Sequence, residues 1–205
     1  MAAPTGNFFD TVKRSFADVP IKADNEISTS EFLEAAESLT TLFDVLGSVA
    51  FTPVKTDMTG NIEKVRERQL KDPAAGETLQ GLVKGELKLT GAEKTHKATE
   101  GLLWLTRGLD FTRQGLSHNL ADPKVELSNS FREAYGKTLK PHHSFVVKPV
   151  FSMAMSATPY RKDFYAKMGD DQTKVEQQLE EWLKALEKIV GILNAFLASK
   201  DAKWK

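Results

Sequence analysis

Apolar side chains recur at alternating steps of three and four residues through most of this 205-residue chain. Over residues 32–46 the apolar positions advance by 4, 3, 4 and 3, and the stretch from Val175 to Phe196 repeats these steps. This spacing puts apolar side chains on one face of an α-helix. Two other apolar stretches, VAFTPVKT and SFVVKPVF, contain proline and do not alternate, so they do not indicate strands. The periodicity therefore predicts an all-α fold.

Capping and breaking residues set the expected helix boundaries. Ser28 and Glu31 form a capping box before the first strong helix, and Gly47 ends it. Near the N-terminus, NFFDTVKRSF is either a short amphipathic helix or a docking tail. We expect about eight helices in one domain, residues 26–205, after an N-terminal segment, residues 1–25. The other helices are expected after residue 53, over 79–87, 98–116, 123–139 and 143–157, from about 160 and from about 171.

Composition excludes several classes of function. The chain has 28 basic and 28 acidic residues, so broad attraction to nucleic acid is not expected. It has no cysteine, and its four histidines lack metal-ligand spacing, so we expect no metal and no other cofactor. No apolar run approaches the roughly 18 residues of a membrane-spanning helix, and the start lacks a signal peptide's apolar core. We therefore expect a cytoplasmic protein.

A polar stripe lies within TDMTGNIEKV, where Asp57, Asn61 and Lys64 share one face of an expected helix. Asp accepts hydrogen bonds, Asn donates and accepts, and Lys donates. Such a set suits a hydroxyl-rich ligand such as a sugar better than a phosphate, which Asp57 would repel. A solvated polar face has the same spacing, so the pattern alone does not decide between the two.

Two single side chains have a structural and a functional interpretation each. Trp104 lies one residue from the centre of its helix's apolar stripe, where it can pack against the core or offer a flat platform to a sugar ring. His143 opens HSFVVKPVFSMAMSAT on an expected apolar face. It is either a satisfied core histidine or a buried donor at the mouth of an apolar cavity.

Three longer motifs occur in order: FDVLGSVAFTPVKTDMTGNIEKV, ATEGLLWLTRGLDF, and PHHSFVVKPVF followed by ATPYRKDF. Together they resemble the glycolipid transfer protein family from about Phe32 to the last helix. The resemblance implies a two-layer, all-helical sandwich that encloses lipid chains in an apolar cavity. It also implies a non-enzymatic carrier that extracts glycosphingolipids and transfers them between membranes.

Carried onto this sequence, the resemblance assigns roles to individual residues. Asp57, Asn61 and Lys64 would bind the headgroup, and Trp104 would stack on its first sugar. Asp57 would also accept from the ceramide amide N–H, and His143 would donate to the amide carbonyl. The residues implied to line the hydrophobic pocket are Phe43, Phe51, Phe111, Leu139 and Phe151.

The implied partners are simple glycosphingolipids, namely glucosylceramide, galactosylceramide and lactosylceramide. A monomer would meet the cytosolic face of membranes transiently. Phe145 stands where family members often carry a Trp that meets the membrane, and Tyr160 is a second candidate for this contact. Glu100 replaces an apolar residue of mammalian-type sequences and could alter how the sphingosine chain is accommodated. Trp204, in a tail that aligns poorly, either lies near the site or frays.

The kind of headgroup is less sharply implied. Relatives that carry ceramide-1-phosphate place cations where this chain has Asn61 and Trp104, which favours a neutral sugar. Arg107, on the same flank as Trp104, is a cation that suits a phosphate, so a phosphate headgroup stays open as an alternative.

Three other functions remain open. The chain could sense or present glycolipid instead of carrying it. It could be a helical adaptor that associates through the heptad-like final helix. It could be an enzyme with Asp57 and His143 as an acid–base pair and Lys64 as an electrophile, although no nucleophile or metal motif accompanies them.

Overall fold

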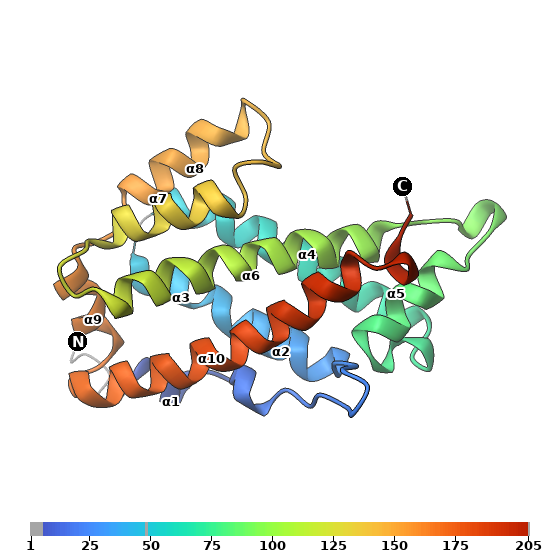
Figure 1. Cartoon of the computed structure of the whole chain (residues 1–205), viewed down its shortest axis with the longest axis horizontal. Coiled ribbons are helices and arrows are strands. Elements are labelled where there is room, and N and C mark those ends of the chain that lie inside the picture. The colour runs from blue at the N-terminus through green and yellow to red at the C-terminus, as the bar shows by residue number, and fades with distance from the viewer. Residues whose placement is uncertain (1–5, 48, 205) are drawn as a thin grey trace.

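The helices of the computed structural model follow the predicted order along the chain (Figure 1). The structure describes residues 6–47 and 49–204, and across these two ranges it contains no strand, only two isolated bridges that pair Ile21 with Ile27 and Ser28 with Thr78. The all-α prediction is therefore confirmed. The α-helices are α1 Phe8–Thr11, α2 Thr29–Thr40, α3 Leu42–Leu46, α4 Thr52–Lys71, α5 Leu79–Leu87, α6 Lys97–Ala121, α7 Leu127–Lys137, α8 Val147–Ser156, α9 Arg161–Met168 and α10 Gln172–Leu197.

Helix α6 is the central element and packs against α4, α7 and α10. Figure 1 shows α6 and α10 crossing in front of α2 and α4, so the helices form two layers. Leu102, Leu105 and Leu109 of α6 are fully buried between the layers. The fold is the two-layer helical sandwich that the family resemblance implies.

The first predicted helix is divided at Thr41, whose side chain and backbone N–H both donate to the Ser38 carbonyl. The expected stop is confirmed, because Gly47 caps α3 with φ of 70°. The predicted capping box is confirmed only in part. Ser28 is the N-cap, but its hydroxyl donates to the Glu31 carboxylate instead of accepting a backbone N–H.

Two helices begin later than predicted. The turn before α7 is closed by Asp122, whose side chain accepts the N–H of Lys124 at 2.9 Å. Helix α8 begins at Val147, not at His143, because the His143 N–H bonds back to the Leu139 carbonyl in a preceding turn. Pro149 lies in the first turn of α8, where a missing N–H removes no helical hydrogen bond.

The N-terminal segment packs on α10. The rings of Phe9 and Phe16 lie 6.2 and 5.3 Å from the ring of Trp182, and Asp10 pairs with Lys174 at 2.9 Å. The short helix α1 and the turn Phe16–Asp18 therefore cover part of the apolar stripe of α10. Residues 1–5 of the predicted segment 1–25 lie outside the described residues, and its boundary at residue 25 stays a prediction.

Candidate functional site

The polar stripe of α4 forms a hydrogen-bonded ladder. Lys64 Nζ donates to Asn61 Oδ1 at 2.9 Å, and Asn61 Nδ2 donates to Asp57 Oδ2 at 3.3 Å. Asn61 is 2% exposed, whereas Asp57 and Lys64 lie at the surface on either side of it. The predicted shared face is thus confirmed as geometry. The buried amide holds the carboxylate and the ammonium in place, and both ends keep capacity for further hydrogen bonds.

The Asp57 carboxylate is desolvated although its side chain reaches solvent. The surrounding protein raises the pKa of Asp57 above its ordinary value, and the charge of Lys64 partly opposes that rise. A carboxylate held in such surroundings gains from any N–H donor that a ligand brings.

Close approach between α4 and α6 depends on Gly101, which the sequence motif alone did not reveal. A Cβ on Gly101 would lie 3.1 Å from Lys64 Cβ and 3.3 Å from the Asn61 carbonyl oxygen. At Gly60, within the stripe itself, a Cβ would meet none of the described atoms within 4 Å. The glycine that lets two helices come together at the ladder is therefore on α6.

The ring of Trp104 stacks on that of His143, with centroids 5.6 Å apart and planes inclined by 19°. These residues lie on α6 and in the turn before α8, so the fold brings two of the predicted site residues together. Arg107 lies over the same indole, with Cζ 4.8 Å from the ring centroid. Burial lowers the pKa of Arg107.

His143 sits between polar and apolar groups. Its ring lies 4.5 Å from that of Phe151, and its Nδ1 is 3.1 Å from the hydroxyl of Tyr135. Burial is the main cause that lowers the pKa of His143, and the charges of His142, Lys148 and Arg107 lower it further. The imidazole is thus held in its neutral form, with one N–H to donate. Tyr135 was not among the predicted site residues.

The five predicted pocket residues are all buried. They come from five places in the chain: α3, the turn Val49–Phe51, α6, the turn that follows α7, and α8. Phe43 stacks on Phe51 with centroids 5.8 Å apart, and Phe111 meets Phe151 at 6.3 Å. Since Phe151 also contacts His143, the apolar set begins directly beneath a polar group.

A cavity of about 660 Å³ opens beside Trp104. Glu100, Trp104 and Arg107 form one wall, and the C-terminal segment from Leu197 to Trp204 forms the other. The tail therefore packs near the site instead of fraying. Glu100, which departs from the mammalian-type pattern, faces this cavity and not the buried phenyl rings.

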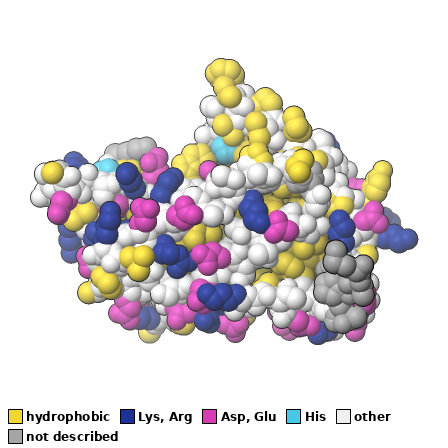
Figure 2. Space-filling model, turned by 180° about the vertical axis from the view of Figure 1, so that it is seen from behind, with side chains coloured by type: hydrophobic (Ala, Val, Ile, Leu, Met, Phe, Trp, Pro, Cys, Tyr) yellow, Lys and Arg dark blue, Asp and Glu magenta, His cyan; other side chains and the backbone are white. Residues whose placement is uncertain are grey.

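An exposed apolar patch adjoins His143. It consists of Phe145, Val146, Val150 and Met153, which are 84, 63, 40 and 67% exposed. Figure 2 shows hydrophobic side chains gathered on the part that projects at the top, where Figure 1 places α8. Tyr160 is 74% exposed but lies beyond the other end of α8. Of these four residues, Phe145 alone was predicted to contact a membrane, although the contiguous run SFVV holds more apolar residues than one buried helix face needs.

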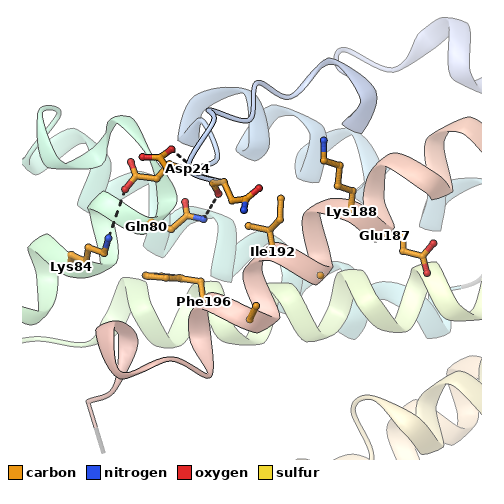
Figure 3. A pocket seen from close by; sticks show the side chains of 11 residues that line it. Asp24, Gln80, Lys84, Glu187, Lys188, Ile192 and Phe196 are labelled. Carbon is orange, nitrogen blue, oxygen red and sulfur yellow. Dashed lines mark hydrogen bonds and ion pairs between the residues drawn. The ribbon is translucent and has the colours of Figure 1, made fainter.

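A separate cavity of about 610 Å³ lies between α10, α5 and the loop at residues 24–26 (Figure 3). Gln80 donates to the Asn25 carbonyl at 2.9 Å, and Lys84 pairs with Glu26 at 3.8 Å. None of the predicted site residues lines it. In the part of the chain that the structure describes, no three His, Cys, Asp or Glu side chains form a metal cluster, and no helix is long and apolar enough to cross a membrane.

Comparison with known proteins finds a family match over most of the chain. The family model described as "Glycolipid transfer protein (GLTP)" matches residues 27–170. A glycolipid transfer protein of Aureobasidium melanogenum is 65% identical over 201 residues, which make up 98% of this chain and 98% of that protein.

Solved structures share the fold, and two of them are similar to this chain in sequence as well. The crystal structure of HET-C2, a fungal glycolipid transfer protein, superposes with a TM-score of 0.92 at 62% identity and covers 96% of this chain and 100% of its own. A structure that addresses how FAPP2 selects simple glycosphingolipids using the GLTP fold has a TM-score of 0.85 at 34% identity, with 97% and 98% covered. Both agree with the fold predicted from the sequence.

Proposed function

The chain belongs to the glycolipid transfer protein family, and on that premise we propose that it extracts simple glycosylceramides from one membrane and delivers them to another. The transfer makes and breaks no covalent bond. Support comes from the 65% identical fungal glycolipid transfer protein and from the FAPP2 structure, which concerns simple glycosphingolipids. The match covers 98% of this chain and 98% of the fungal relative, so the proposal applies to the chain as a unit.

The contact between Trp104 and His143 carries the proposal. It joins a flat aromatic surface, suited to the apolar face of a sugar, to a neutral hydrogen-bond donor above buried phenyl rings. A lipid with a sugar, an amide and long chains presents these three features in the same order. Asp57, Asn61 and Lys64 would hold the sugar hydroxyls, and Asp57 with His143 would hold the amide.

Solvation explains why a carrier is needed. Each lipid CH₂ costs about 0.8 kcal/mol to leave in water, so two long chains face a high barrier to spontaneous transfer. A protein cavity lowers that barrier by replacing water with apolar contacts. In this structure the phenyl rings of the predicted pocket touch one another, so the rings must separate as the chains enter.

The polar groups would determine which lipids the protein binds. A lipid without an amide would leave the desolvated Asp57 carboxylate without the amide N–H donor, and an unsatisfied buried group costs about 1–3 kcal/mol. A galactosyl diacylglycerol, which has no amide, should therefore move more slowly than galactosylceramide. A neutral sugar fits the ladder better than a phosphate, because Asp57 would repel the phosphate. Equal transfer of ceramide-1-phosphate would contradict this preference.

Loading requires contact with a bilayer. The exposed apolar patch beside His143 is the proposed contact, since its side chains leave water when they enter the bilayer interface. Tyr160 is a second candidate from the sequence. We place this encounter at the cytosolic face of membranes. We assign it to a monomer, because the apolar stripe of α10 is already buried against α6 and the N-terminal segment.

The test is transfer of a fluorescent galactosylceramide between vesicles. Asp57→Ala and Trp104→Ala should each lose most of the activity of the wild-type protein. Asp163→Ala removes an exposed carboxylate from α9 and should retain it. Extraction of lipid without delivery would support a sensing or presenting role instead. No extraction at all, or full activity in both site variants, would contradict the proposal, and chemically altered lipid would support an enzyme.

A further inference from the structure

Tyr135 and His143 form a pair that connects α7 to the turn before α8. The phenol oxygen lies 3.1 Å from His143 Nδ1. Tyr135 is 4% exposed, and its ring stacks on Phe151 with centroids 5.4 Å apart and planes inclined by 11°. The same phenyl ring contacts His143, and Trp104 covers the imidazole from another side. The imidazole is therefore held by three aromatic neighbours and one hydrogen bond.

The chemistry of the two groups decides which one donates. If His143 donated from Nδ1, the Tyr135 hydroxyl hydrogen would need its own acceptor in a buried setting. Among the described residues, His143 Nδ1 is the only hydrogen-bond partner of that hydroxyl. If Tyr135 donates, both atoms are satisfied. Burial raises the pKa of Tyr135, so the phenol keeps its proton at neutral pH. The low pKa of His143 leaves its Nδ1 lone pair available.

We propose that Tyr135 is a positioning residue that donates its hydroxyl hydrogen to Nδ1 of His143 and so fixes the imidazole as the Nε2–H tautomer. In that tautomer His143 presents a donor, not an acceptor, to the bound lipid. The consequence for binding rests on the proposed function: the donor meets the amide carbonyl of the ceramide. Without the phenol the imidazole can place its hydrogen on either nitrogen, and one of the two forms presents a lone pair to the carbonyl.

The first test needs no lipid. ¹⁵N NMR of the His143 ring, assigned by comparison with His143→Gln, should show an unprotonated Nδ1 and a protonated Nε2 at neutral pH. Tyr135→Phe keeps the stacked ring and should shift both resonances toward a mixture of tautomers. Tyr165→Phe is the matched control, because it removes another buried phenol hydroxyl, one without a hydrogen-bond partner among the described residues. It should leave the His143 spectrum unchanged.

Two results would overturn the assignment. One is a wild-type His143 with its hydrogen on Nδ1, and the other is a Tyr135→Phe spectrum identical to that of the wild type. If Tyr135→Phe does not fold, incorporation of 3-fluorotyrosine into the wild-type chain replaces it. The fluorinated phenol is a stronger donor and should move the Nδ1 resonance, whereas no movement would contradict the hydrogen bond.

The second test measures binding. Tyr135→Phe should weaken galactosylceramide binding by about three- to tenfold, the worth of one hydrogen bond. Binding of an alkyl galactoside, which has the sugar but no carbonyl, should not change. An equal loss for both ligands would indicate a merely structural role for Tyr135. If the wild type binds no glycosylceramide, the proposed function fails, and the NMR result still decides the role of Tyr135.

Discussion

The guanidinium of Arg107 lies over the indole of Trp104, with Cζ 4.8 Å from the ring centroid. The two residues are one helical turn apart on α6, so the contact depends on no other element. Arg107 is partly buried, and its pKa is lowered by that burial. A cation held over an indole contributes about 0.5–1 kcal/mol at exposed sites and more when desolvated. Arg107 thus helps to orient the aromatic ring that the proposed function assigns to the sugar.

Arg107→Met should slow galactosylceramide transfer by about two- to fivefold, because it removes the cation over Trp104 but keeps an aliphatic side chain. It should also raise the pKa values of His142 and His143, since the charge of Arg107 lowers both. NMR titration of the two imidazoles measures this effect. Arg113→Met, which alters an arginine paired with Asp110 and Glu187, is the control and should move neither pKa. Unchanged histidine pKa values in Arg107→Met would contradict the electrostatic link.

Phe145→Ala should reduce vesicle binding and the initial transfer rate by about tenfold, because a large apolar side chain contributes about 1.5–3 kcal/mol when fully withdrawn from water. Phe145→Trp should bind vesicles more strongly, since an indole suits the membrane interface. Leu70→Ala truncates an apolar side chain of α4 that is 72% exposed outside the patch, and should leave vesicle binding unchanged. Unaltered partitioning of Phe145→Ala would remove the patch from the loading step.

The fold could be predicted because steps of three and four persist through nearly every helix. The start of α8 could not be predicted, because the apolar run around Phe145 continues through a turn. The spacing of apolar residues does not show where the backbone turns. Hydrogen bonds across the turn, such as that from the His143 N–H to Leu139, decide where the helix begins.

The candidate site, too, could be predicted from the sequence only in part. Asp57, Asn61 and Lys64 are four and three residues apart, so spacing alone predicted their common face. Trp104 and His143 are distant in sequence and meet only through the packing of α6, α7 and α8; family resemblance, not spacing, indicated that they belong together. Tyr135 had no sequence signal, because its contact with His143 depends on the turn between α7 and α8.

Gly115→Ala should destabilise the protein, because the added Cβ would lie 2.6 Å from Cδ1 of Phe131 at the contact between α6 and α7. Overpacking of a core typically costs about 1–3 kcal/mol, which outweighs the gain of up to about 1 kcal/mol in helix propensity. Gly136→Ala is the matched control within α7, where the new Cβ would meet none of the described atoms within 4 Å. It should be neutral or stabilising. Urea unfolding of both variants measures the difference, and equal midpoints would contradict the packing argument.

Asp57→Asn should make the protein more stable at neutral pH and less active. Folding raises the pKa of Asp57 above its ordinary value of 3.8, chiefly by desolvation. Between these two pKa values, the native protein binds the carboxyl proton more tightly than the unfolded chain does. The free energy of unfolding therefore falls as pH rises through that window. At every higher pH the wild type stays less stable by the full amount. The variant does not ionise, so its advantage in urea unfolding should vanish below pH 3.8 and reach its full size above the raised pKa. Galactosylceramide transfer should nevertheless fall, because a charge-assisted acceptor for the amide N–H becomes a weaker neutral one. A stability advantage that is independent of pH would contradict the desolvation of this carboxylate, and full transfer activity would remove Asp57 from the lipid site.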